Sequence, residues 1–255
     1  MPIRLVCCIS LPPATILSAP VFDFACDNEE LLEVETEQYF ACCGKSICGG
    51  CVQTFSKIGN VDNCPYCKAE KIGKTDEEEV EAMNKRVDAN DAHSIYMLGS
   101  FHYYGYLGML QDREIVEELW TKAARLGSSR AHFGLGGIYE KRGDMKRAKF
   151  HYESAAMAGH EVARFSLGHM EGENGNVDQV VKHWTIAASG GCYDAMRELR
   201  EGFEEGHVSR DAIDSILIAY NSSCAEMRSE ARDTCIQVMI ETIQLSQPRF
   251  VHYIP

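Results

Sequence analysis

Six of the chain's twelve cysteines lie in one short stretch, ACCGKSICGGCVQTFSKIGNVDNCPYCK, which begins at Ala41. They form an adjacent pair and two C-x2-C pairs: Cys42/Cys43, Cys48/Cys51 and Cys64/Cys67. A C-x2-C turn lets two thiolates reach one ion, and zinc takes four such ligands in a tetrahedron at about 2.3 Å. Two such pairs with twelve residues between them are typical of a zinc site. The alternative, a disulfide framework or a set of buried free thiols, is characteristic mainly of small secreted domains.

The composition otherwise indicates an ordinary globular protein of 255 residues, enough for one large domain or two smaller ones. The net charge of −13, with no local basic cluster, argues against a nucleic-acid partner or an anionic membrane surface. No apolar run reaches the roughly 18 residues that suggest a membrane span. Because the cysteines favour a reducing compartment, we expect a cytoplasmic location, with the nucleus as the alternative.

The first 22 residues resemble a weak secretory signal, with one basic residue, an apolar run and a small-residue end. Pro12 and Pro13 interrupt the apolar run, so we expect residues 1–22 to be a disordered leader. Cys7 and Cys8 lie too far upstream for a usual ligand spacing, and we treat them as spare thiols.

Asp23 and Cys26 form a further candidate ligand pair ahead of the cysteine stretch. Cys26 lacks a cysteine partner nearby, and Asp23 occupies the position that such a partner would take. A carboxylate oxygen can bind zinc at about 2.0–2.2 Å, although it is a harder ligand than a thiolate. Alternatively, Asp23 is a solvated loop residue, and water or a leader cysteine completes the site.

These four pairs resemble the ligand pairs of a RING finger of the variant with cysteines in place of the usual histidine. The resemblance implies a cross-braced, zinc-stabilised α+β module over residues 23–72 that binds two Zn2+ ions. The implied ligands of the first zinc are Asp23, Cys26, Cys48 and Cys51. The implied ligands of the second zinc are Cys42, Cys43, Cys64 and Cys67.

RING fingers that act as ubiquitin ligases dock a ubiquitin-conjugating enzyme and do no covalent chemistry themselves. The resemblance places this contact at Ala25, Phe55, Pro65 and Lys68. Ala25 is smaller than the usual apolar residue, and an aspartate at position 23 departs from the family pattern. Two hypotheses therefore stay open: a RING-type ubiquitin ligase, and a non-catalytic scaffold whose zinc only folds the module. No nucleophile–base pair or phosphate-binding loop indicates a small-molecule enzyme, so we name no catalytic residue.

Residues 73–90 predict a linker helix. Thr75 or Asp76 can cap it, and the acidic residues after the cap suit the positive end of the helix dipole. Lys85 and Arg86 suit the opposite end. An apolar stripe over Val80, Met83 and Val87 indicates that this helix docks the zinc module onto the remainder of the chain.

Three blocks of similar sequence come next, and most of their marks recur every 32 residues. The marks are Leu98-Gly99, Leu135-Gly136 and Leu167-Gly168, then Trp120, Tyr152 and Trp184, then Ala-Ala-x-x-Gly ending at Gly127, Gly159 and Gly191. A fourth, degraded block begins at Asp194. Each block predicts two helices, with the glycine of Leu-Gly where a neighbouring backbone comes close and the last glycine just past the second helix.

This pattern resembles Sel1-like repeats. The resemblance implies an all-α solenoid over residues 91–228 that binds a protein or peptide on its concave face. We expect a helical extension and a frayed tail over residues 229–255. Five histidines along the repeats show no ligand spacing and are interpreted as ordinary surface or core residues: His132, His151, His160, His169 and His183.

Overall fold

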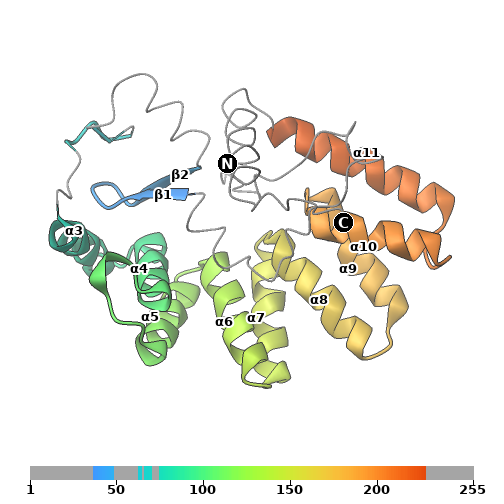
Figure 1. Ribbon diagram of the computed structural model, residues 1–255, viewed down its shortest axis with the longest axis horizontal. Helices are drawn as coiled ribbons and strands as arrows, with labels where there is room; N and C mark the ends of the chain where they lie inside the picture. The colour runs from blue at the N-terminus through green and yellow to red at the C-terminus, as the bar shows by residue number, and fades with distance from the viewer. Residues whose placement is uncertain (1–36, 49–62, 65, 71–74, 228–255) are drawn as a thin grey trace, which may run out of the picture.

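The computed structural model describes residues 37–48, 63–64, 66–70 and 75–227. Within these ranges, a small β-hairpin is followed by helices that stack in chain order along an arc (Figure 1). The expected leader over 1–22 and the expected tail over 229–255 lie outside the described residues.

The hairpin pairs β1 (Glu37–Phe40) with β2 (Lys45–Cys48) in antiparallel register. Glu37 lies opposite Cys48, and Phe40 lies opposite Lys45, so residues 41–44 form the turn. Gly44 closes this turn with a left-handed φ of 65°, a conformation that glycine adopts without steric cost. Two short strands are only marginally stable by themselves, so the hairpin depends on what it packs against.

The helices begin with α3, which lies across the start of a regular series of pairs. Their bounds are α3 Asp76–Asp88, α4 Ala92–Tyr104, α5 Arg113–Arg125, α6 Ser129–Lys141, α7 Met145–Met157, α8 Glu161–Glu173, α9 Val177–Ser189, α10 Tyr193–Glu204 and α11 Arg210–Met227. The pairs α4/α5, α6/α7, α8/α9 and α10/α11 correspond to the three blocks and the degraded fourth one. The prediction of an all-α repeat region is therefore confirmed.

The helix ends have the expected local chemistry. Thr75 caps α3 by accepting a hydrogen bond from the N–H of Glu78. The glycines after α5, α7 and α9 are all left-handed, with φ of 91° at Gly127, 88° at Gly159 and 99° at Gly191. The longer loop of the first block contains the 3-10 turn η3 (Tyr106–Gly108) between α4 and α5.

The glycine of each Leu-Gly mark has a different neighbour from the expected one. The prediction of a close backbone was wrong, because an aromatic ring of the second helix of the same pair lies there. A Cβ at Gly99 would lie 2.5 Å from the indole of Trp120, and Gly168 faces Trp184 in the same way. The preceding leucines are buried. The first helix of each pair therefore places its leucine in the core, while its glycine leaves room for the aromatic ring of the second helix.

Two clusters of buried side chains form the core. One runs from Tyr39 of the hairpin through Met83 of α3 to Met170 of α8, and the other runs from Phe165 to Tyr220 of α11. The hairpin, α3 and the first repeats therefore share one core. Among the described helices, none combines the length and the apolar character that crossing a bilayer requires.

Candidate metal centre

Four cysteines converge at one end of the hairpin. Cys42 and Cys43 lie in the β1–β2 turn, and Cys64 and Cys67 lie in a tight loop closed by a bridge between Asn63 and Glu70. All four Sγ atoms lie within 4.8 Å of one another. The Sγ atoms of Cys43 and Cys64 are 3.6 Å apart, and those of Cys42 and Cys67 are 3.5 Å apart.

These separations fit four thiolates around one ion. A tetrahedron of sulfurs at about 2.3 Å from zinc has edges of about 3.8 Å. A disulfide would bring two sulfurs to about 2.05 Å, and all four cysteines are free. The donor set is wholly sulfur, which suits zinc and excludes the hard cations that require oxygen ligands.

Backbone hydrogen bonds set the position of each cysteine pair. The N–H groups of Cys43 and Gly44 both donate to the carbonyl of Phe40, which folds the hairpin turn. In the second pair, the N–H of Lys68 donates to the carbonyl of Cys64 at 3.0 Å. Lys68 has a φ of 61°, so the chain reverses directly after Cys67.

Three of these thiols differ in how readily they lose a proton. Burial raises the pKa of Cys42 and of Cys43, and their contacts with Cys64 raise it further. Burial also opposes ionisation of Cys64, but N–H groups of Cys67 and Tyr66 and the neighbouring thiols lower the pKa of Cys64 to about 7. A bound cation would favour the thiolate form of all four, because metal binding releases their protons.

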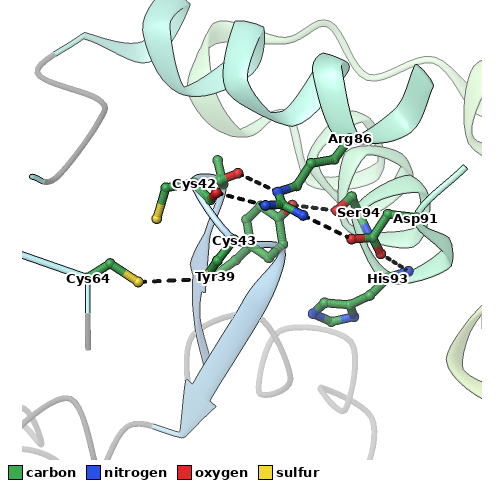
Figure 2. A network of polar contacts seen from close by, with 9 residues as sticks. Tyr39, Cys42, Cys43, Cys64, Arg86, Asp91, His93 and Ser94 are labelled. Atoms are coloured by element: carbon green, nitrogen blue, oxygen red, sulfur yellow. Dashed lines mark hydrogen bonds and ion pairs between the residues drawn. The ribbon is translucent and has the colours of Figure 1, made fainter. Parts of the chain in front are cut away.

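A single arginine joins this turn to the helices. The Nε of Arg86 donates to the carbonyl of Ala41 at 2.8 Å, and its Nη2 donates to the carbonyl of Cys42 at 2.7 Å. Figure 2 shows the guanidinium between these carbonyls and the carboxylate of Asp91. Sequence reasoning placed Arg86 only at the basic end of a helix, because nothing in the sequence marks a backbone carbonyl as its partner.

Two side chains of α4 make further contacts with the hairpin. The hydroxyl of Tyr39 donates to Oγ of Ser94 at 2.7 Å, and both residues are buried. Burial raises the pKa of Tyr39 to about 12, so the phenol stays protonated and donates. Oγ of Ser46 lies 2.8 Å from Nε2 of His93, whose ring meets that of Tyr39 edge-on.

The other predicted site residues fall outside this cluster. Asp23, Cys26 and Cys51 lie outside the described residues, and of Cys48 only the backbone, in β2, is described. The described residues therefore contain one candidate metal centre, and no second one is shown. Of the predicted conjugating-enzyme contacts, Ala25, Phe55 and Pro65 also lie outside them, whereas Lys68 is described and exposed.

The repeat histidines make contacts that their spacing did not indicate. Nδ1 of His132 lies 3.0 Å from Nδ1 of His151, which links α6 to α7. His160 stacks on Phe133 with ring centroids 4.6 Å apart. The first contact joins the two helices of one repeat, and the second joins α6 to the N-cap of α8 in the next repeat, so these residues pack within the repeats as expected.

Comparisons with known proteins bear on the helical region. No protein-family profile matches the chain, and no curated protein matches it. A Sel1 repeat protein from Oxalobacter formigenes has a similar solved structure, with a TM-score of 0.50, 21% identity, and coverage of 59% of this chain and 64% of that one. A protective antigen present in uropathogenic Escherichia coli strains, displaying an SLR fold, gives a TM-score of 0.49, 20% identity, and coverage of 72% and 46%.

The chain spans less than two thirds of either protein. At 21% identity, the likeness to the Oxalobacter protein concerns the fold alone. Together with the 32-residue marks and the paired helices, it shows that the helical region has the fold of a Sel1-like repeat solenoid.

Proposed function

We propose that the chain is an intracellular RING-type protein whose zinc module recruits a ubiquitin-conjugating enzyme and whose Sel1-like repeats hold a protein substrate. One observation carries this proposal. The cluster joins Cys42/Cys43 to Cys64/Cys67, two pairs that lie far apart in the sequence. These two pairs are the ligands that a cross-braced RING finger uses for one of its two zinc ions.

The position of Cys48 supports the same pairing. Cys48 pairs with Glu37 at the end of the hairpin opposite the turn, three residues beyond Lys45. At about 3.3 Å per residue, the backbone of Cys48 is therefore displaced by roughly 10 Å along the strand from the turn that holds Cys42 and Cys43. In the proposed module, Cys48 and Cys51 then bind a second zinc together with Asp23 and Cys26.

The repeat region would supply the second binding function. A solenoid of stacked helix pairs offers an extended surface, and such surfaces bind proteins or peptides. Joining a conjugating-enzyme site to a substrate site in one chain raises the local concentration of one partner near the other. In the proposed module, Lys68, which is exposed directly after Cys67, contacts ubiquitin.

The proposal is tested by ubiquitin transfer. Purified protein is incubated with ubiquitin, activating enzyme, ATP and a panel of conjugating enzymes, and we expect ubiquitin chains to form. Cys64→Ser, which removes a buried thiol of the cluster, should abolish them, whereas Cys224→Ser in α11 should not. The absence of chains across the panel would contradict the ligase assignment.

A non-catalytic scaffold is the second candidate, and the contacts of Arg86 favour it. The hairpin is hydrogen-bonded to α3 and α4 and shares their core, so it packs on the first helices of the described stack. Terminal units of repeat proteins commonly serve as caps in this way. A scaffold would bind zinc and a protein partner yet give no ubiquitin chains in the same assay.

A further inference from the structure

Arg86 lies between the cysteine turn and the first helix of the repeat region. Two of its nitrogens donate to the carbonyls of Ala41 and Cys42, and its Nη1 lies 3.5 Å from Oδ2 of Asp91 (Figure 2). The other carboxylate oxygen of Asp91 accepts the N–H groups of His93 and Ser94, which caps α4. One side chain therefore contacts both the backbone of a candidate metal ligand and the cap of the first repeat helix.

The turn and this cap also fit tightly against each other. A Cβ on Gly44 would lie 2.5 Å from Oδ2 of Asp91 and 3.0 Å from Nη1 of Arg86. The buried hydrogen bond between Tyr39 and Ser94 makes a second link a short distance away. The cysteine turn cannot shift far without disturbing at least one of these contacts.

We propose that metal in the four-cysteine centre and the order of the first repeat are thermodynamically linked through Arg86. Metal holds the turn in the shape that presents two carbonyls to the guanidinium, and the guanidinium in turn holds Asp91 at the start of α4. Loss of the metal loosens α4, so the beginning of the repeat region responds to metal. This inference rests on metal binding at the four cysteines, as in the proposed function, and makes Arg86 a positioning residue for the metal.

Linkage of this kind acts equally in both directions. If the docked turn binds metal better than the free turn, metal must favour docking by the same factor. Groups that orient metal ligands from outside the ligand shell typically change metal affinity by 10- to 100-fold when they are replaced. Arg86 bonds to a ligand's backbone and not to its sulfur, so we expect an effect near the lower limit.

The zinc affinity of the full chain tests whether docking through Arg86 strengthens metal binding. The zinc-loaded wild type, Arg86→Lys and Lys85→Ala are titrated with a chromogenic chelator. Arg86→Lys keeps the charge but cannot reach both carbonyls, so its zinc affinity should fall about tenfold. Lys85→Ala should match the wild type, because Lys85 is 73% exposed and its ion pair among the described residues is with Glu81 on the same helix. Tyr39→Phe, which removes the second link, should weaken zinc binding by a smaller factor.

Hydrogen exchange tests whether bound metal orders the start of α4. Removing zinc from the wild type should speed amide exchange at the start of α4, including Ile95, and leave α10 unchanged. In Arg86→Lys, exchange in α4 should already be fast with zinc bound. A wild type that binds no zinc would overturn the metal centre itself. A wild type that binds zinc, with Arg86→Lys equal to it in affinity and in exchange, would overturn only the linkage.

Discussion

The ring of Tyr152 lies flat against the backbone of Gly136. A Cβ built on that glycine would lie 2.5 Å from Cδ1 and Cε1 of the ring, a separation that real Cβ atoms do not show. Tyr152 is buried, and its hydroxyl donates to Glu140 at 2.6 Å, so the ring has little room to move away. The contact joins the two helices of the second repeat, α6 and α7.

This contact predicts opposite effects of alanine at two adjacent glycines. Gly136→Ala should overpack the contact and lower the free energy of unfolding by about 2 kcal/mol. Gly137→Ala should raise it by about 0.5–1 kcal/mol, because the new Cβ would lie 3.8 Å from the nearest Tyr152 atom and alanine favours the helix. Denaturant unfolding of both variants is the measurement. Equal effects would show that helix propensity, and not the ring, governs Gly136.

The fourth repeat shows what the sequence pattern can predict and what it cannot. Arg200 stands where the other repeats have glycine, and Ile216 stands sixteen residues later, where Tyr152 and Trp184 stand in theirs. Without a ring to accommodate, the glycine is no longer needed, and Ile216 is buried in α11. The sequence alone predicts that the fourth block is degraded. That the glycine and the aromatic residue are lost together becomes clear only when the contact between these two positions is known.

The metal centre was predictable in part for a similar reason. Cysteine spacing and the family resemblance brought Cys42, Cys43, Cys64 and Cys67 together as one ligand set, and the structure places their sulfurs within 4.8 Å. The role of Arg86 could not be predicted, because its partners are carbonyls 44 and 45 residues away and every residue has a carbonyl. The other predicted zinc depends on residues outside the described part of the chain, so it stays a prediction.

Zinc content should distinguish cluster cysteines from the others. We expect about two zinc ions per wild-type chain and about one in Cys64→Ser, because three thiolates hold the ion poorly. Cys224→Ser, in the last repeat, should keep the wild-type value. Metal analysis after gel filtration measures this. A chelator should also lower the melting temperature of the wild type, since metal that binds only the folded chain stabilises it.

The contradicting outcome is a Cys64→Ser protein that keeps the zinc content of the wild type. A folded Cys64→Ser chain, verified by its far-UV circular dichroism, is needed as the control. Loss of zinc in Cys224→Ser as well would point to general unfolding instead of a specific site.

His160 should make stability depend on pH. It caps α8 through Nδ1, which accepts the N–H of Ala163 at 3.2 Å and so must be unprotonated. Burial, and then the charge of Arg130, lower the pKa of His160 to about 4 from an unfolded value near 6.5. Between these pH values the unfolded chain binds more protons than the folded chain. Stability is therefore full above about pH 6.5 and falls as the pH drops toward 4.

The slope from this one residue can reach about 1.4 kcal/mol per pH unit. Burial also lowers the pKa of His132, His151 and His183. These residues therefore also make the folded state less stable as the pH falls. His160→Asn keeps a side-chain oxygen for the cap but does not titrate, so its stability should fall less steeply over this range. Denaturant unfolding at several pH values measures the slope, and an unchanged slope would exclude His160 as a source.

The final prediction concerns a position at which the second and third repeats differ. Glu171 stands where the second repeat has Tyr139. The hydroxyl of Tyr139 donates to Glu117 on α5 at 2.7 Å, whereas Glu171 on α8 accepts from Lys149 on α7 at 2.6 Å. Each pair is separated by 22 residues and joins a first helix to the preceding second helix. The chemistry differs, but the link between neighbouring repeats is retained.

Moving the pair of one repeat into the next tests this equivalence. Lys149→Glu alone places two carboxylates together at a site where Glu171 is only 12% exposed, so it should destabilise the protein by about 1 kcal/mol or more. Adding Glu171→Tyr recreates the pairing of Glu117 with Tyr139 and should recover most of that loss. A double-mutant cycle by denaturant unfolding gives the coupling energy. Simple additivity of the two changes would mean that these positions do not act as a pair, and that the third repeat is held to the second by its apolar core alone.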